Sequence, residues 1–201
     1  MALTQLLIAT RNRDKAKEFQ EMVRDLGIDI LTLHDVPGMA DIVEDAPTLE
    51  GNALKKAREA FRHARIPSLG DDTGLEVHYL DDEPGVMSSR YAGPGATYAD
   101  NCRKLLRALR GVPPRRRAAR FRCVLALVLD EGSEELVEGV CAGVILEEPR
   151  GANGFGYDPV FLPRGHTQTF AEMESSLKNS ISHRGLAFQK MRGILVKHTA
   201  R

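Results

Sequence analysis

Two apolar segments on either side of a short polar turn place the strongest constraint on the fold of this chain. Residues 121–129 and 136–146 are rich in apolar side chains, and they flank Asp130-Glu131-Gly132-Ser133. This pattern is typical of two neighbouring strands joined by a tight turn, so it predicts a long antiparallel hairpin. A sheet with at least one antiparallel pair must therefore lie at the centre of the fold.

The rest of the chain alternates between strand and helix patterns. Short apolar or alternating segments predict strands at 6–9, 30–33 and 75–80. Apolar side chains spaced three and four apart predict helices over 16–26, 48–64, 97–109 and 182–197. Strands and helices that interleave in this way favour an α/β fold with a mixed sheet and surrounding helices. The length of 201 residues favours a single domain over residues 1–201.

Composition excludes several functional classes. The apolar fraction of 42% and the charged fraction of 28% are those of an ordinary globular domain, which excludes global disorder. The 28 basic residues balance the 28 acidic ones, so we expect no nucleic-acid partner, and the basic run at 115–120 is expected to be a solvated face. The longest apolar runs have seven residues, against roughly 20 for a membrane-spanning helix. Three cysteines without a CxxC pair favour reduced thiols in a cytoplasmic protein.

A first polar cluster follows the first expected strand. Thr10-Arg11-Asn12-Arg13-Asp14-Lys15 offers a hydroxyl, an amide and three cations where a helix begins. Free N–H groups at a helix start, together with cations, suit a phosphate. The sequence lacks the GxxxxGK[ST] pattern of a Walker loop, and an ordinary capped helix start explains the segment equally well.

A second and a third cluster carry carboxylates. Glu44 precedes a helix on which Asn52 and Lys56 share a face. Gly70-Asp71-Asp72-Thr73-Gly74 is expected to form a turn between two strands. Adjacent carboxylates repel each other unless they bind a cation or share a proton, which favours a Mg²⁺ ligand or a general base. An ordinary Asp-Asp-Thr-Gly turn is the alternative.

A fourth cluster combines a glycine loop with cations. Residues 151–159 contain Phe155 and Tyr157 between glycines, which lack the dinucleotide-binding order GxGxxG. These two rings are candidates to stack on a base, with Asp158, Lys178, His183 and Arg184 as donors and acceptors for its edge. His183 and Arg184 fall in the first turn of the last helix, where a cation is unfavourable, so an anion or polar ligand is expected beside them.

Taken together, these clusters closely resemble the inosine triphosphatase family, the pyrophosphatases of unusual purine nucleoside triphosphates. The resemblance covers nearly the whole chain, and its specificity comes from the order and spacing of the motifs. Asp14, Thr73 and Gly70 differ from the commoner family residues, and Asp14 is expected to weaken phosphate binding. The matching segments are 9–12 with Lys15 and Glu18, Glu44, 52–53 with 56–57, 71–75, 84–86 with 89–91, Asn101, 105–106, 121–123, 154–159 and 178–184.

The resemblance implies an α/β homodimer, with two lobes flanking a central cleft in each chain. It implies hydrolysis of ITP, dITP and XTP to the monophosphate and pyrophosphate, with Mg²⁺. Asp72 is then the proton acceptor and a metal ligand, Glu44 is a second metal ligand, and Asp71 supports both. The triphosphate is then held by Lys15 and Lys56 with Thr10, Asn12 and Thr73, and Arg11, Arg13 and Asp14 of the same loop are counted among the substrate-binding residues. The residues for the base are Phe155, Gly156, Tyr157, Asp158, Lys178, His183 and Arg184.

Two alternatives remain. One is a pyrophosphohydrolase of the same scaffold that acts on another modified nucleotide, such as a pyrimidine triphosphate. The other is a nucleotide- or RNA-binding module without catalysis. A pure polyphosphate binder gains nothing from Glu44, Asp71 and Asp72, which would repel its ligand.

Overall fold

The computed structural model describes residues 3–199, which form two compact units. Unit 1 comprises the described residues 3–72, 123–139 and 184–199, and unit 2 comprises residues 73–122 and 140–183. The chain passes between the units four times, at 72–73, 122–123, 139–140 and 183–184. Neither unit is a continuous stretch of sequence.

The described residues contain one mixed sheet of seven strands, in the order β2-β1-β3-β5-β6-β7, with β4 paired to β3. β1 pairs in parallel with β2 and β3, whereas β3–β4 and β6–β7 are antiparallel. The predicted mixed sheet and its hairpin, β5–β6, are confirmed. The strands are β1 Gln5–Ile8, β2 Asp29–Thr32, β3 Ser68–Val77, β4 Pro84–Gly85, β5 Ala118–Asp130, β6 Ser133–Ile145 and β7 Phe161–Pro163.

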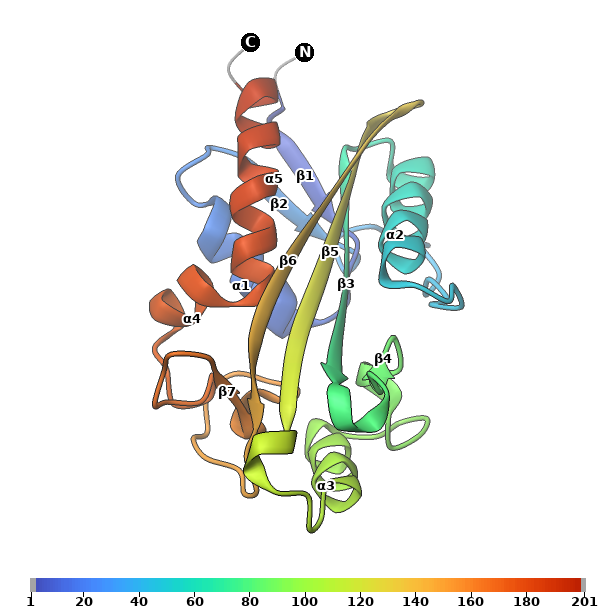
Figure 1. Cartoon of the computed structure of the whole chain (residues 1–201). Helices are drawn as coiled ribbons and strands as arrows, with labels where there is room; N and C mark the ends of the chain where they lie inside the picture. Colours follow the sequence, from blue (N-terminus) through green and yellow to red (C-terminus); the bar gives the residue numbers. More distant parts are fainter. Residues whose placement is uncertain (1–2, 200–201) are drawn as a thin grey trace. The chain divides into compact units, whose positions relative to one another are not determined.

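Helices cover both faces of the sheet in unit 1 (Figure 1). Successive side chains of β1 point to opposite faces. Leu6 and Ile8 pack with α1 Arg13–Val23 and α5 His183–Thr199, where Phe19 meets Phe188 edge-on at 6.2 Å between ring centroids. Leu7 and Ala9 pack on the other face, where α2 Leu49–Ala64 contributes Ala60. The strand alternation therefore gives each face its own helices.

Unit 2 has a core of its own. Phe121 lies at its centre, with Phe161 at 4.7 Å and Phe170 at 6.2 Å between ring centroids. α3 Tyr98–Ala108 packs Leu105 into this core, and Thr97 caps its start in a reciprocal pair with Asp100. Unit 2 also contains α4 Ser175–Ile181, which the sequence analysis missed because seven residues are too few for a clear helical period.

One expectation was wrong and bears on the site. Residues 70–74 were expected to form a turn between strands, but they lie inside β3, which is continuous from Ser68 to Val77. Aspartate and glycine are poor strand formers, so local propensity favoured a turn. The strand is nearly all buried between β1 and β5, and buried cations compensate its carboxylates.

Two other expectations concern the cysteines and the helices. Cys102, Cys123 and Cys141 are free and buried, as predicted from their number and spacing. Burial raises the pKa of the Cys102 and Cys141 thiols to about 11. Among residues 3–199, no helix has the length and apolar character needed to cross a bilayer.

Candidate active site

The two adjacent aspartates of β3 point to opposite faces of the strand, because side chains alternate along it. Asp71 faces α1 and α5, where its carboxylate meets Lys15 and Arg184. Asp72 faces α2, where its carboxylate meets Lys56 and Asn52. A turn would have left both carboxylates in one environment. The strand instead gives each a separate set of partners.

Asp71 is held by cations on both of its oxygens. Its Oδ1 accepts from Lys15 Nζ and, at 3.4 Å, from an Arg184 terminal nitrogen. Its Oδ2 accepts from Arg184 Nε at 2.8 Å and from the Cys123 thiol at 3.3 Å. Burial by itself raises the pKa of Asp71, but Arg184 and Lys15 outweigh it and hold the pKa well below its usual range. Asp71 is therefore a fixed anion.

Asp72 and Glu44 share a single ammonium group. Lys56 Nζ lies 2.8 Å from Asp72 Oδ1 and 2.5 Å from Glu44 Oε1, and Asn52 Nδ2 donates to Asp72 Oδ2 at 3.2 Å. Burial raises the pKa of Asp72 above its usual value, against the opposing pull of Lys56. Burial lowers the pKa of Lys56, but Asp72 and Glu44 outweigh this and raise it. Lys56 thus contacts both carboxylates, and the charge of Lys15 adds a smaller attraction for Asp72.

These carboxylates fit a magnesium ion. Among the described residues, no group of three or more His, Cys, Asp or Glu side chains could hold a metal by itself. Mg²⁺ does not require such a cage, because it commonly takes one or two carboxylates and completes its shell with water and substrate phosphates. Glu44 and Asp72 are oxygen donors close enough to contact the same cation, Lys56 Nζ. The donor set therefore suits Mg²⁺ together with a phosphate ligand.

Gly70 sets the distance between β3 and α2. A Cβ atom there would lie 2.9 Å from Ala57 N and 3.0 Å from Ala53 C, and closer still to Ala53 O. Gly70 and Asp72 are two apart in the strand, so they face the same helix. The missing side chain allows the close approach that brings Lys56 to Asp72.

We expect Gly70→Ala to lower the free energy of unfolding by about 1–3 kcal/mol, because the methyl group forces α2 away from β3. Urea unfolding followed by circular dichroism measures this change. Gly193→Ala is the matched control, since no atom lies within 4 Å of its Cβ position on α5 and alanine favours a helix. A Gly70→Ala protein as stable as Gly193→Ala would contradict the close approach.

The segment before α1 is a capped helix start with one cation directed to the site. Asn12 Oδ1 accepts from the N–H groups of Asp14 and Lys15, and Thr10 Oγ1 accepts from Asn12 N. Lys15 reaches Asp71. Arg11 instead donates to Asp41 Oδ1 and to the backbone oxygens of Leu33 and Met39, while Arg13 and Asp14 are exposed. The structure thus brings Lys15, but not Arg11, to the aspartates.

The glycine loop of unit 2 presents Phe155 beside a cation. Asp158 is buried, and its Oδ2 accepts from Phe155 N at 2.9 Å and from Lys178 Nζ at 2.7 Å. Lys178 Nζ also lies 4.7 Å from the centroid of the half-buried Phe155 ring. Gly154 and Gly156 have positive φ, and a Cβ on Gly154 would meet the Asp158 carboxylate. Asp158 therefore fixes both a ring and an ammonium group.

The other residues expected at the base lie in different surroundings. Tyr157 is buried in the core of unit 2, and its hydroxyl donates to Ser88 O at 2.9 Å. The His183 ring is buried and stacks on Phe121 at 4.4 Å. The Arg184 guanidinium belongs to unit 1 and contacts Asp71 and Glu18. The anion expected beside the last helix is thus supplied, for Arg184, by the protein's own carboxylates.

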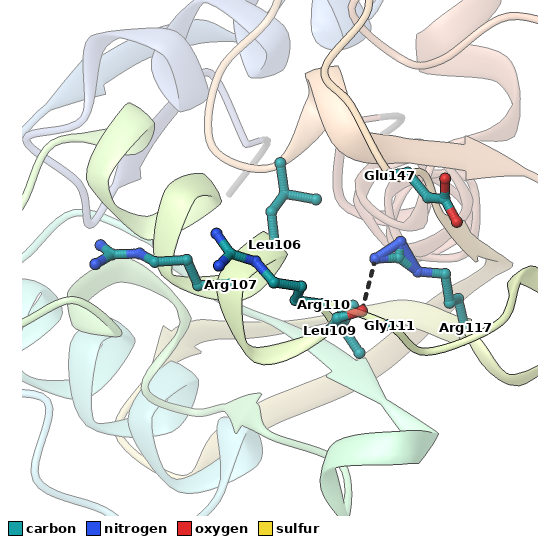
Figure 2. Close-up of a pocket in the computed structure, with 7 residues that line it drawn as sticks. All are labelled: Leu106, Arg107, Leu109, Arg110, Gly111, Arg117 and Glu147. Carbon is teal, nitrogen blue, oxygen red and sulfur yellow. Dashed lines mark hydrogen bonds between the residues drawn. The ribbon is translucent and has the colours of Figure 1, made fainter.

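Unit 2 also has a cavity of about 330 Å³ that no expected site residue lines (Figure 2). Arg117 lines it together with Arg107, Arg110 and Glu147. Arg117 belongs to the basic run that was expected to be a solvated face, but it is buried and donates to Leu109 O at 3.1 Å, at the end of α3. Arg117 therefore caps the C-terminal end of α3, whereas Arg115 and Arg116 are exposed as expected.

Two residues that lie in segments matched by the family resemblance, but that were assigned no role, contact the site. Glu18 Oε2 accepts from Arg184 at 2.6 Å, and the Cys123 thiol donates to Asp71. Glu18 lies one helical turn after Lys15, so its spacing on α1 placed it on the same face. Nothing local marks Cys123, because its contact with Asp71 depends on the pairing of β3 with β5.

Comparisons with known proteins agree with the motifs. Residues 6–194 match the model of the Ham1 family. A dITP/XTP pyrophosphatase from Desulforamulus reducens is 45% identical over 94% of this chain and 94% of that protein. A dITP/XTP pyrophosphatase from Porphyromonas gingivalis is 46% identical over 96% of this chain and 98% of that protein. The structure of a HAM1 protein from Coxiella burnetii is 40% identical and covers 96% of this chain and 99% of that chain, with a TM-score of 0.85. The chain therefore belongs to the Ham1 family.

Proposed function

We propose that this protein hydrolyses dITP, XTP and ITP to the nucleoside monophosphate and pyrophosphate. The names of its relatives support this activity. The observation that carries the proposal is the placement of Asp71 and Asp72 on opposite faces of β3, each against its own lysine. Asp71 is a fixed anion beside Lys15, and Asp72 is a second carboxylate beside Lys56. The lysines provide positive charge for a polyphosphate, and the carboxylates provide negative charge for a water molecule.

The roles of the side chains in unit 1 follow from their partners. Lys15 and Lys56 are cations for the phosphate oxygens, whose negative charge grows in the transition state. Asp72 accepts the proton of the attacking water, because Asp71 is held between two cations and is a poorer base. Glu44 and Asp72 would hold Mg²⁺, which supplies positive charge at the phosphates when it is bound. Thr10 and Asn12, and Thr73 at the start of unit 2, are proposed to complete the triphosphate contacts.

The side chains of unit 2 are proposed to bind the base. Phe155 offers a ring face, and Lys178 is a donor beside it. Hypoxanthine and xanthine carry a 6-keto acceptor, whereas adenine carries a 6-amino donor that would oppose an ammonium group. We propose that Gly156, Asp158 and His183 shape this part of the site, with Tyr157 supporting the loop from the core.

Two finer features of the proposal, Mg²⁺ as the cofactor and a homodimer, rest on the family resemblance. A single domain, a cytoplasmic location, and no nucleic-acid or membrane partner are proposed from the chain length, the cysteines, the balanced charge and the short apolar runs. Hydrolysis of another modified nucleotide, such as a pyrimidine triphosphate, stays the main alternative. A binding module without catalysis is disfavoured by the buried carboxylates Asp71 and Asp72, which a polyphosphate binder would have to compensate.

We expect the purified protein to release pyrophosphate from dITP, XTP and ITP in the presence of Mg²⁺, with little turnover of ATP. Hydrolysis of the anhydride bond between the α- and β-phosphates yields the monophosphate and pyrophosphate, and no Walker loop is present to favour cleavage of the terminal phosphate. Released pyrophosphate and orthophosphate are measured separately in a panel that includes modified pyrimidine triphosphates. EDTA should abolish turnover.

Orthophosphate as the first product, in a preparation free of other pyrophosphatases, would overturn the proposal. Preferred turnover of a pyrimidine triphosphate would support the main alternative. Binding of dITP without any product would support the binding module.

A further inference from the structure

Arg117 is a buried cation that pairs with no carboxylate of the described residues. It is 3% exposed, and its guanidinium donates to two backbone oxygens, Leu146 O at 3.2 Å and Leu109 O at 3.1 Å. Its Nε–H is also buried and has no hydrogen-bond partner within residues 3–199. Arg184, which is buried as well, contacts two carboxylates. Burial of an unpaired charge is costly, so Arg117 favours an anion from outside the chain.

The cavity beside Arg117 carries an excess of positive charge. Arg107, near the C-terminal end of α3, and Arg110, just after the helix, line this cavity together with Arg117. Glu147 is the one acidic residue among its described lining residues, so three positive charges and one negative charge leave a net charge of +2. All four residues belong to unit 2. The volume of about 330 Å³ lies at the lower end of the range for small-molecule sites, which suits a small anion.

The three arginines differ in how firmly they are held. Figure 2 shows Arg117 directed toward Leu109, with the Arg107 and Arg110 side chains extended away from it. Arg107 Nε donates to Arg103 O at 3.3 Å, which leaves its terminal nitrogens for a ligand. Arg107 and Arg110 are exposed, so their long side chains keep rotamer freedom and can turn toward a bound anion. Arg117 therefore offers a preformed donor, and the other two arginines offer adaptable ones.

A phosphate group matches this set of donors. Arginine presents its N–H groups in a planar fork that fits two phosphate oxygens, and a phosphate keeps further oxygens for other donors. Its charge of about −1.5 to −2 at pH 7 is close to the charge needed to balance the cavity. We propose that this cavity is a binding site for a phosphate oxyanion, with Arg117 as the central donor and Arg107 and Arg110 as the outer ones. The site uses none of the residues proposed for catalysis or for the base.

The test follows the arginine Nε–H resonances of the full chain by ¹H–¹⁵N NMR during titration in the absence of Mg²⁺. The Arg117 resonance is identified by its loss in Arg117→Lys. We expect a saturable shift of this resonance, because Nε–H gains a hydrogen bond, and no such shift with NaCl at the same ionic strength. Inorganic phosphate, pyrophosphate and inosine monophosphate are the probes. Tighter binding of the inorganic ions would indicate a free anion as the ligand, whereas tighter binding of the monophosphate would indicate a nucleotide phosphate.

Variants of the lining residues test the role of each charge. Arg107→Ala and Arg110→Ala should each weaken binding about two- to fivefold, the range expected for an exposed charge pair. Glu147→Gln should strengthen binding by a similar factor, because it removes the negative charge that opposes the anion. Arg115→Ala is the matched control, since Arg115 is an exposed arginine outside the cavity lining. If Arg117→Lys does not fold, the Arg117 resonance is assigned by triple-resonance NMR of the wild type.

Three outcomes would overturn the inference. The first is the absence of a saturable shift at Arg117, or an equal shift with NaCl. The second is wild-type affinity in both Arg107→Ala and Arg110→Ala. The third is loss of the Arg117 shift in Lys15→Ala, which would assign the bound phosphate to the proposed active site instead. All of these measurements report binding without turnover, so their outcome is independent of the proposed hydrolysis.

Discussion

Replacing Asp72 with asparagine should lower kcat for dITP by at least about 100-fold while the protein stays folded. Asparagine has nearly the same size and keeps one oxygen for Lys56, but it cannot accept a proton from water. Loss of a general base costs about 10²- to 10⁴-fold, and Asp72→Asn also removes one of the two charges proposed to hold Mg²⁺. We therefore expect the largest loss of turnover at this position.

Steady-state hydrolysis measures this change, and circular dichroism with a thermal melt reports the fold. Asp45→Asn is the matched control, because Asp45 is an exposed aspartate that neighbours Glu44 and pairs with Lys55. The control should keep wild-type activity within about twofold, since exposed ion pairs contribute little. An Asp72→Asn enzyme that retained more than about a tenth of wild-type kcat would show that another group accepts the proton.

The sequence predicted most of the fold because most elements have a clear local signal. The β5–β6 hairpin surrounds a polar turn, and Thr48 caps the start of α2, where its side chain accepts from Gly51 N. α4 and β7 are too short for a visible period. The prediction of a turn at Asp71 and Asp72 was wrong for a different reason: these residues lie in a strand. Its stability comes from cations that lie far away in the sequence, on α1, α2 and α5.

The same reason limits what the sequence could predict of the site. It identified Lys15, Lys56 and Asp72, but it could not show which cation meets which carboxylate, because adjacent aspartates diverge only if their backbone is extended. It grouped Phe155 with Tyr157 as two aromatics in one loop. The structure buries Tyr157 in the core and leaves the Phe155 ring half-buried. Residue types thus indicate which chemistry a site can perform, whereas the role of each residue depends on which side chains meet in the folded structure.

We expect Lys56→Met to lower the free energy of unfolding by about 3 kcal/mol and kcat for dITP by at least about 100-fold. Methionine has a similar length, but it leaves Asp72 and Glu44 facing each other without the ammonium that compensates both. Removing one partner of a buried ion pair is strongly destabilising, because the remaining charge has lost its partner. The proposed phosphate contact of Lys56 is lost with the same substitution, which accounts for the effect on turnover.

The response to Mg²⁺ tests whether loss of the Lys56 ammonium charge is what destabilises Lys56→Met. If Lys56→Met is destabilised because Asp72 and Glu44 have lost the ammonium group that both contact, Mg²⁺ should raise its melting temperature more than that of the wild type, because a ligand that binds only the folded state stabilises it. Lys55→Met is the matched control, since the adjacent Lys55 pairs with Asp45 at the surface and should change stability by less than about 1 kcal/mol. A Lys56→Met protein as stable as Lys55→Met would show that the buried ammonium is not needed to hold Asp72 and Glu44 together. A destabilised Lys56→Met protein with no response to Mg²⁺ would argue against these two carboxylates as the magnesium ligands.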